Sequence, residues 1–278
     1  MTAAIEAEGA PSAVPAGAAG AGGIMVIKFG GTSVATASRI RVAARRVRSL
    51  RRRGWRPVVV VSAPGLTTDH LLRRLAAVTR GDPSASRALG READRALATG
   101  EELSAALLAA ALLAIGIPAV SLRAAEAGIL AAGDHGAGTP VALRADRLRH
   151  ILAGPSVPIV AGFQGVRPDG ETVTLGRGGS DISAVFLAVE LAAAECQIVT
   201  DVDGVYTADP RLDPAAERLP ALSHQDLVGI TARGAVVVHP AAATRASAAG
   251  IPLRIFHFRA PLRSPGGTVV TRVRGGAR

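Results

Sequence analysis

The residues best suited to chemistry form the stretch Lys28-Phe29-Gly30-Gly31-Thr32-Ser33, which follows a short apolar run. A strand, a glycine turn and a helix start together present backbone N–H groups and the positive end of a helix dipole, which suits a phosphate. Lys28 adds a full charge at this turn, and it is the only lysine among 32 basic residues. We therefore predict a phosphate site that needs a compact ammonium rather than a planar guanidinium. The alternative is an ordinary strand-to-helix turn, since the pattern is not that of a P-loop.

A second glycine-rich stretch is Gly176-Arg177-Gly178-Gly179-Ser180-Asp181. The apolar residues that follow it recur at helical spacing, so we expect the glycines and the Ser-Asp pair at a helix N-terminus. The alternative is a plain capping turn. A cap needs one Ser or Asp, however, and not two adjacent glycines beside an arginine. We therefore favour a binding role for this turn.

A third stretch runs from Thr200 to Arg211 and contains the chain's only tyrosine, Tyr206. A strand is expected to end at Thr200, and a lone aromatic ring at the C-terminal end of a parallel strand lies where an open α/β sheet would place a nucleotide base. The acidic residues here could bind a metal, with Asp201 the best placed. Asp-Gly and Asp-Pro are also routine turn sequences, so no residue is assigned as a metal ligand.

The composition argues against several classes of protein. Only 3% of the residues are aromatic, so the core must consist of Ala, Val, Leu and Ile. The single cysteine, Cys196, excludes an internal disulfide and favours a cytoplasmic location. A net charge of +10 could indicate nucleic acid, but the arginines are scattered and lack interleaved aromatic residues, so we predict no nucleic-acid partner. The densest basic run, 45–56, is interpreted as the exposed face and end of a helix.

No membrane segment or signal peptide is expected. The longest apolar run, 103–115, is shorter than the roughly 20 residues that span a bilayer, and it is predicted to be a buried helix. Residues 1–23 have neither a basic start nor a leucine-rich run, and we expect them to be a disordered extension.

Strands alternate with helices along the remaining chain, which predicts an α/β fold with a mainly parallel central sheet covered on both faces, in three αβα layers. Strands are expected at 24–27, 58–61, 119–122 and 157–161, with another ending at residue 200. Helices are expected after a cap at Thr32 or Ser33, from a cap at 67–69 through 78, over a long region interrupted at 99–102, and over 146–152. Residues 128–141 are predicted to form a hairpin or a mobile loop.

Taken together, these stretches resemble the catalytic domain of the aspartate kinases, within the amino-acid kinase family. The resemblance runs from about Ile24 to Val270 and implies an amino-acid-binding lobe over 24–165 and a nucleotide-binding lobe over 166–278. It depends on several motifs in order: Lys28 to Ser33, Ser62 with Thr67-Thr68-Asp69, Gly100-Glu101, Ala161-Gly162-Phe163, Gly176 to Asp181, Thr200 to Arg211, and His239-Pro240.

The resemblance implies transfer of the ATP γ-phosphoryl group to the side-chain carboxylate of L-aspartate, with Mg²⁺ accompanying ATP and a homodimer as the expected assembly. It assigns the catalytic roles to Lys28, which would hold the phosphoryl group, and to Asp181, which would orient the lysine. The other implied roles are phosphate binding by Gly30, Gly31, Thr32, Gly178 and Gly179, amino-acid binding by Ser62, Thr68, Glu101, Arg177 and Ser180, and nucleotide binding by Thr200, Asp201, Tyr206 and Arg211.

The residue chemistry agrees with these roles. A carboxylate nucleophile is already ionised at pH 7, so no general base is needed, and catalysis is mostly positioning and charge neutralisation. Arg177 can pair with a carboxylate and Glu101 can receive an ammonium. The site would therefore have a cation for the phosphate, a second cation for a carboxylate and an anion for an amine. This set of charges matches an amino-acid substrate, and it does not match a sugar or a nucleobase.

Two departures from the family pattern keep alternatives open. Val236 stands where the family usually has a lysine that contacts the nucleotide, so a catalytically weak regulatory subunit is the main rival. Arg233 or another arginine could replace that lysine. The chain also stops soon after residue 270, without the ACT domains that commonly follow, and we expect an enzyme without built-in feedback inhibition. A kinase for another ω-carboxyl amino acid is the second alternative.

Overall fold

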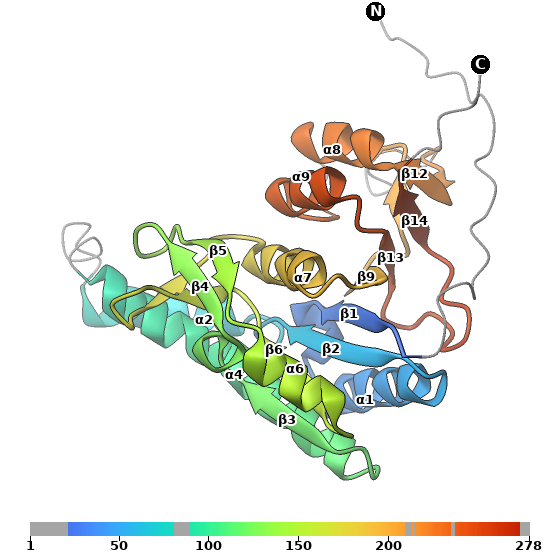
Figure 1. Ribbon diagram of the computed structural model, residues 1–278. Coiled ribbons are helices and arrows are strands. Elements are labelled where there is room, and N and C mark those ends of the chain that lie inside the picture. The colour runs from blue at the N-terminus through green and yellow to red at the C-terminus, as the bar shows by residue number, and fades with distance from the viewer. Residues whose placement is uncertain (1–21, 81–88, 209–212, 214, 235–236, 273–278) are drawn as a thin grey trace, which may run out of the picture.

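The chain folds around an eight-stranded sheet flanked by two layers of helices (Figure 1). The computed structural model describes residues 22–80, 89–208, 213, 215–234 and 237–272. The strand order is β12-β14-β13-β9-β1-β2-β6-β3, and every pair of neighbours is parallel except β13 with β14. The predicted three-layer fold with a mainly parallel sheet is confirmed. The strands are β1 (Ile24–Phe29), β2 (Arg56–Val61), β3 (Ala119–Leu122), β6 (Val157–Ala161), β9 (Glu195–Thr200), β12 (Ala221–Ser223), β13 (Leu253–His257) and β14 (Thr268–Thr271).

The side chains of each central strand alternate between two cores, as the period of a strand requires. On one face, Ile27 and Phe29 of β1 pack with α1 (Ala37–Arg52) and α4 (Gly90–Leu113). On the other, Val26 packs with the helices of the opposite layer. These are α5 (Ala124–Ala127), α6 (Asp146–Ala153), α7 (Gly179–Glu190), α8 (His224–Ala232) and α9 (Pro240–Ala249).

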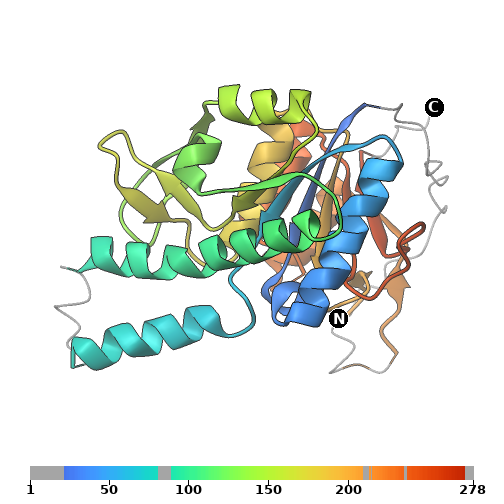
Figure 2. The same cartoon turned by 90° about the horizontal axis from the view of Figure 1, so that it is seen from below.

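Two smaller sheets complete the fold. The first has the order β5-β4-β7-β8 and contains the predicted hairpin, β4 (Ile129–Ala132) with β5 (Thr139–Leu143), beside β7 (Gln164–Val166) and β8 (Thr172–Thr174). The second pairs β10 (Val205–Tyr206) with β11 (Arg218–Leu219). Helix α2 (Thr67–Val78) runs alongside α4 (Figure 2).

Two of the predicted helix caps are wrong, the one at Thr32 or Ser33 and the one at residues 67–69. Thr32 and Ser33 lie in a short 3₁₀ turn, Gly31–Val34, and α1 begins later, where the Thr36 hydroxyl accepts a hydrogen bond from the Arg39 N–H. Helix α2 begins at Thr67 without a side-chain cap, since the Thr67 hydroxyl donates instead to the Pro64 carbonyl.

Helix α4 differs from its prediction in two ways. It runs without a break through Thr99–Glu102, where an interruption was expected. It is also only half-buried, because Leu103, Leu107 and Leu113 are exposed on one side. By length and composition alone α4 could cross a membrane. Half of its apolar window is buried in the domain, however, and that side packs against the sheet and α1, which is the position of a core helix.

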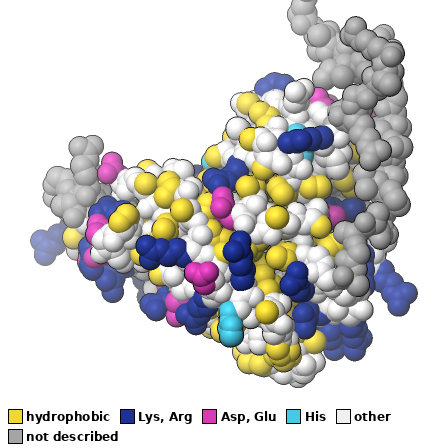
Figure 3. Space-filling view, in the orientation of Figure 1, with side chains coloured by type: hydrophobic (Ala, Val, Ile, Leu, Met, Phe, Trp, Pro, Cys, Tyr) yellow, Lys and Arg dark blue, Asp and Glu magenta, His cyan; other side chains and the backbone are white. Residues whose placement is uncertain are grey.

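One residue of the predicted exposed basic run is buried. Arg46 is 3% exposed, its guanidinium donates to the Ala260 and Pro261 carbonyls, and it stacks over the Phe256 ring. The segment after β13 therefore uses a cation from α1 to satisfy its carbonyl groups. Elsewhere, on the face seen in Figure 3, basic side chains lie at several separate places among acidic and apolar ones.

Candidate active site

The predicted motifs meet at one edge of the sheet because parallel strands end together. Phe29 is aligned with Val61 on one side and with Val199 on the other, and Val61 is aligned with Ala161. The chain leaves these strands through Gly30, Ser62, Gly162 and Thr200. Ligands of open α/β sheets bind beyond the carboxyl ends of the strands, so this edge is the candidate site.

Lys28 and Asp181 form an ion pair at this edge. Lys28 shares a face of β1 with Val26, towards α7, and its Nζ lies 2.7 Å from Oδ1 of Asp181 in the first turn of α7. Both side chains are nearly buried, with 12% and 11% exposed. The other oxygen of Asp181 accepts the His239 backbone N–H at 3.1 Å. The carboxylate is thereby fixed from two sides, and it holds the ammonium at the glycine turn.

The turn after β1 packs tightly against the loop after β2. A Cβ on Gly31 would lie 2.7 Å from the Ala63 carbonyl oxygen, and the Gly65 N–H donates to the Gly31 carbonyl at 3.0 Å. A Cβ on Gly100, in α4, would lie 2.7 Å from the Ala63 Cβ. Glycines are needed at both positions, because any side chain would separate the three segments.

This close packing brings Glu101 into the site. Its side chain is buried at 3% exposure, and Oε1 accepts the Ala63 N–H at 2.9 Å. Oε2 is also buried and has no hydrogen-bond partner among the described residues. Burial raises the pKa of Glu101 to about 8, while the Ala63 N–H and the charge of Lys28 act in the opposite direction. A buried carboxylate oxygen without a donor is suited to an incoming ammonium.

The turn before α7 is built from glycines with positive φ. Gly176 has φ +72° and Gly178 has φ +70°, and a side chain on Gly178 would overlap the His239 ring. The turn leaves Arg177 exposed. Ser180 is buried, and a Cβ on Gly162 would lie 3.0 Å from its Cβ. The predicted helix N-terminus is confirmed, and it faces the end of β6.

The predicted nucleotide residues are more dispersed. Thr200 ends β9 and its hydroxyl donates to the exposed Asp201 carboxylate at 3.2 Å. Tyr206 is wrongly placed by the sequence argument, since it lies in the β10–β11 ribbon and not at the end of a parallel strand. Its hydroxyl donates to Asp203 at 2.6 Å, and this hydrogen bond raises the pKa of Tyr206.

Two positions of interest, Arg211 and Val236, lie outside the described residues. Within the described part of the chain, no group of three or more His, Cys, Asp or Glu side chains could hold a metal ion.

The remaining substrate residues of the prediction flank the same loop. Ser62 precedes Ala63, and its N–H donates to the Phe29 carbonyl, while Thr68 lies in the first turn of α2.

The sequence argument missed Asp94, a buried carboxylate on α4. A single aspartate within a helical pattern carries no local signal that separates it from a surface residue.

Most of the chain, including the segments at this edge, matches proteins of known class. The family model described as "Amino acid kinase family" matches residues 23–257. Aspartokinases from Thermus thermophilus and Geobacillus stearothermophilus are 41% and 43% identical to this chain over 250 and 248 residues, which is 90% and 89% of the chain. The chain spans 60% and 59% of the length of these two relatives.

Solved structures give the same likeness. An aspartate kinase from Synechocystis superimposes with a TM-score of 0.75 at 41% identity, covering 89% of this chain and 40% of that one. E. coli aspartokinase III in complex with aspartate and ADP superimposes with a TM-score of 0.78 at 27% identity, covering 90% of this chain and 64% of that one.

Proposed function

This chain belongs to the amino acid kinase family, and from that premise we propose that it phosphorylates the side-chain carboxylate of L-aspartate with ATP. The observation that carries the proposal is the grouping of the Lys28–Asp181 pair, the unpartnered Glu101 oxygen and the exposed Arg177 around one strand edge. Its relatives named as aspartokinases support the choice of acid.

Each end of the substrate has a partner in this arrangement. Glu101 receives the α-ammonium at its free oxygen and releases to solvent the proton that burial retains on it at pH 7, because the incoming positive charge favours the ionised form. Arg177 pairs with the α-carboxylate. Ser62, Thr68 and Ser180 complete the amino-acid site with hydroxyl groups. The side-chain carboxylate is then directed at the γ-phosphorus of ATP, near Lys28.

In the reaction, a carboxylate oxygen forms a bond to the γ-phosphorus, the bond from that phosphorus to the bridging oxygen breaks, and ADP leaves with the electron pair. Lys28 neutralises charge on the transferring phosphoryl oxygens, with the amides of Gly30, Gly31 and Thr32 around it. Asp181 keeps the ammonium in place. No proton has to be removed from the nucleophile, because a carboxylate is ionised at pH 7.

The nucleotide is proposed to lie on the side of β9. Thr200, Asp201, Tyr206 and Arg211 are the residues assigned to it, with Gly178 and Gly179 at the phosphates. Mg²⁺ arrives with ATP, and it binds substrate phosphates and water with few protein ligands, so a dedicated protein cage is not required.

The proposed division into two lobes assigns four strands of the large sheet to each lobe. Strands β1, β2, β6 and β3 come from the amino-acid lobe, 24–165, and β12, β14, β13 and β9 come from the nucleotide lobe, 166–278. A cytoplasmic location, favoured by the single cysteine, and a homodimer, expected from the family, are also part of the proposal.

A hydroxamate assay tests the function. The protein is incubated with ATP, Mg²⁺ and hydroxylamine and with aspartate, glutamate or N-acetylglutamate, and the acyl phosphate is trapped as a coloured hydroxamate. We expect product with aspartate at an ordinary kinase rate. Product with another acid alone would change the substrate, and no product in protein that binds ATP would refute the proposal in favour of a regulatory subunit.

A further inference from the structure

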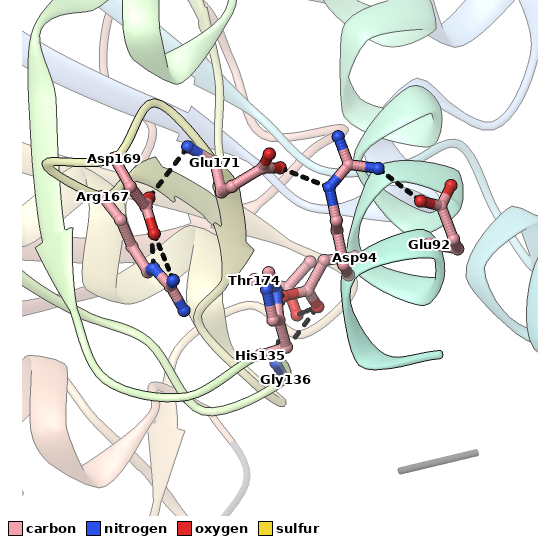
Figure 4. Close-up of polar contacts among 9 residues, drawn as sticks. Glu92, Asp94, His135, Gly136, Arg167, Asp169, Glu171 and Thr174 are labelled. Carbon is pink, nitrogen blue, oxygen red and sulfur yellow. Dashed lines mark hydrogen bonds and ion pairs between the residues drawn. The ribbon is translucent and has the colours of Figure 1, made fainter. Parts of the chain in front are cut away.

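Asp94 is a buried carboxylate that the proposed mechanism does not use. It lies in α4 and is 1% exposed. Four hydrogen bonds converge on it: from the Thr174 hydroxyl at 2.5 Å, from His135 Nδ1 at 2.8 Å, and from the Gly136 N–H at 3.1 Å to each of its oxygens (Figure 4). Because an ionised carboxylate only accepts, Nδ1 of His135 carries the hydrogen. The Gly136 N–H can only donate, so this position requires an acceptor.

The partners of Asp94 belong to the segments that hold the glycine turn of the site. Thr174 ends β8, two residues before Gly176, and its carbonyl accepts the Gly138 N–H at 2.8 Å. The Gly136 carbonyl oxygen is 3.4 Å from the place that a Cβ on Gly176 would occupy. The β4–β5 loop and the start of the turn that carries Arg177 are thus packed together and tied to α4.

The same face of α4 also contacts the segments on the other side of the site, which are the loop after β2 and strand β7. Asp94, Ala98 and Glu101 are spaced four and three residues apart, which places them on one side of a helix. The Ala98 carbonyl accepts from the Gln164 side chain at 3.2 Å, and Glu101 accepts the Ala63 N–H. Asp94 and Glu101 are separated by about 10 Å of helix, at about 1.5 Å per residue.

We propose that Asp94, with Thr174 and His135, is a positioning residue for the amino-acid substrate: it sets the turn carrying Arg177 at a fixed distance from Glu101. The inference depends on the proposed function. A turn with glycines at 176, 178 and 179 has many conformations to lose, and ordering it before the substrate arrives lowers the free energy that binding must supply. An amino acid that is held by Glu101 at its ammonium and by Arg177 at its carboxylate requires a fixed distance between these two side chains.

Thr174→Val tests the inference, because it removes the hydroxyl donor and keeps the shape. We expect the KM for aspartate to rise about tenfold, the size of a lost hydrogen bond to a charged group, while the KM for ATP stays within about twofold. Thr174→Ser keeps the hydroxyl and should restore the KM for aspartate. Thr231→Val is the matched control: its buried hydroxyl donates to the Leu227 carbonyl within α8, and its loss should leave the KM for aspartate unchanged.

A second readout does not depend on turnover. Hydrogen exchange of a peptide covering 175–179 should be faster in Thr174→Val than in wild type, and unchanged in Thr231→Val. A Thr174→Val protein with a lower Tm but an unchanged ratio of the two KM values, or with unchanged exchange in this peptide, would overturn the inference. An inactive wild-type protein would instead refute the proposed function, and the exchange experiment would still decide whether Asp94 and Thr174 order the turn.

Discussion

Replacing Glu101 by glutamine is expected to stabilise the ligand-free protein. Burial raises the pKa of Glu101 from 4.5 to about 8. Between these values the folded state holds a proton that the unfolded state has released, so the free energy of unfolding falls as the pH rises through this window. Glutamine has no proton to retain, and its side-chain oxygen can still accept the Ala63 N–H. The loss of stability with pH should therefore disappear in Glu101→Gln.

The magnitude follows from the width of the window. Each pH unit in it is worth roughly 1.4 kcal/mol, so Glu101 lowers the free energy of unfolding by about 3 kcal/mol at pH 7 relative to pH 4.5. In a chain of this size 1 kcal/mol moves the Tm by about 2–4 °C. The glutamine variant should accordingly melt several degrees above wild type at pH 7, with a larger difference at pH 8.

Thermal unfolding from pH 5 to pH 9 measures this difference. Glu92→Gln is the control, because Glu92 is exposed on the same helix, and it should follow wild type at every pH. The gap between Glu101→Gln and wild type should widen up to about pH 8 and then stay constant. A gap that does not change with pH, or a variant that is less stable than wild type at pH 8, would refute the reasoning.

The same variant separates stability from binding. Aspartate should raise the Tm of wild type, since a ligand of the folded state stabilises it by mass action, and should do so much less in Glu101→Gln. Loss of the ion pair with the ammonium should raise the KM for aspartate by about tenfold or more. An equal response of the two proteins to aspartate would place the ammonium elsewhere.

Three further changes test other parts of the site and fold. Lys28→Ala should lower kcat by on the order of 10³-fold while ADP binding, measured by calorimetry, persists; near-normal turnover would remove Lys28 from the mechanism. Gly100→Ala should lower the Tm and the activity, although alanine favours a helix, because its added Cβ would meet Ala63 in the loop after β2. Gly229→Ala in α8 is the control: the added Cβ has room there, and the variant should have a slightly higher Tm. Arg46→Met should cost about 1–3 kcal/mol of unfolding free energy by removing the hydrogen bonds to the Ala260 and Pro261 carbonyls and the stacking on Phe256. Arg45→Met at an exposed neighbour should cost little, and equal effects in chemical denaturation would contradict the argument from the burial of Arg46.

Local patterns predicted most of the elements because each depends on neighbours in the chain. The apolar run at 157–161 is predicted and observed with the same bounds, and the helix after Gly179 follows from its apolar spacing. The glycine turn beside the only lysine marked the candidate site, since a residue type used once in so basic a chain is informative by itself. Alternation of strands and helices was enough for the parallel three-layer fold.

Local patterns were wrong where tertiary contacts decide. The break expected at Thr99–Glu102 is absent, because Gly100 is present for its close contact with Ala63 rather than to end a helix. Arg46 is like the arginines around it in sequence, and only its position beneath the segment after β13 makes it a buried donor.

By itself the sequence singled out the candidate residues. Residue type and local spacing pointed to the cation at residue 28 and to the glycine turn with residues 177 and 181, and the resemblance to the aspartate kinases added the carboxylate at residue 101 and the proposed role of each. The tertiary structure alone decided how they meet. Strand order brings Phe29 beside Val199, and α4 carries Asp94 to Thr174, a residue 80 positions away. Local propensity does not encode such contacts, since they form only when the sheet has assembled and apolar burial has fixed the helices against it.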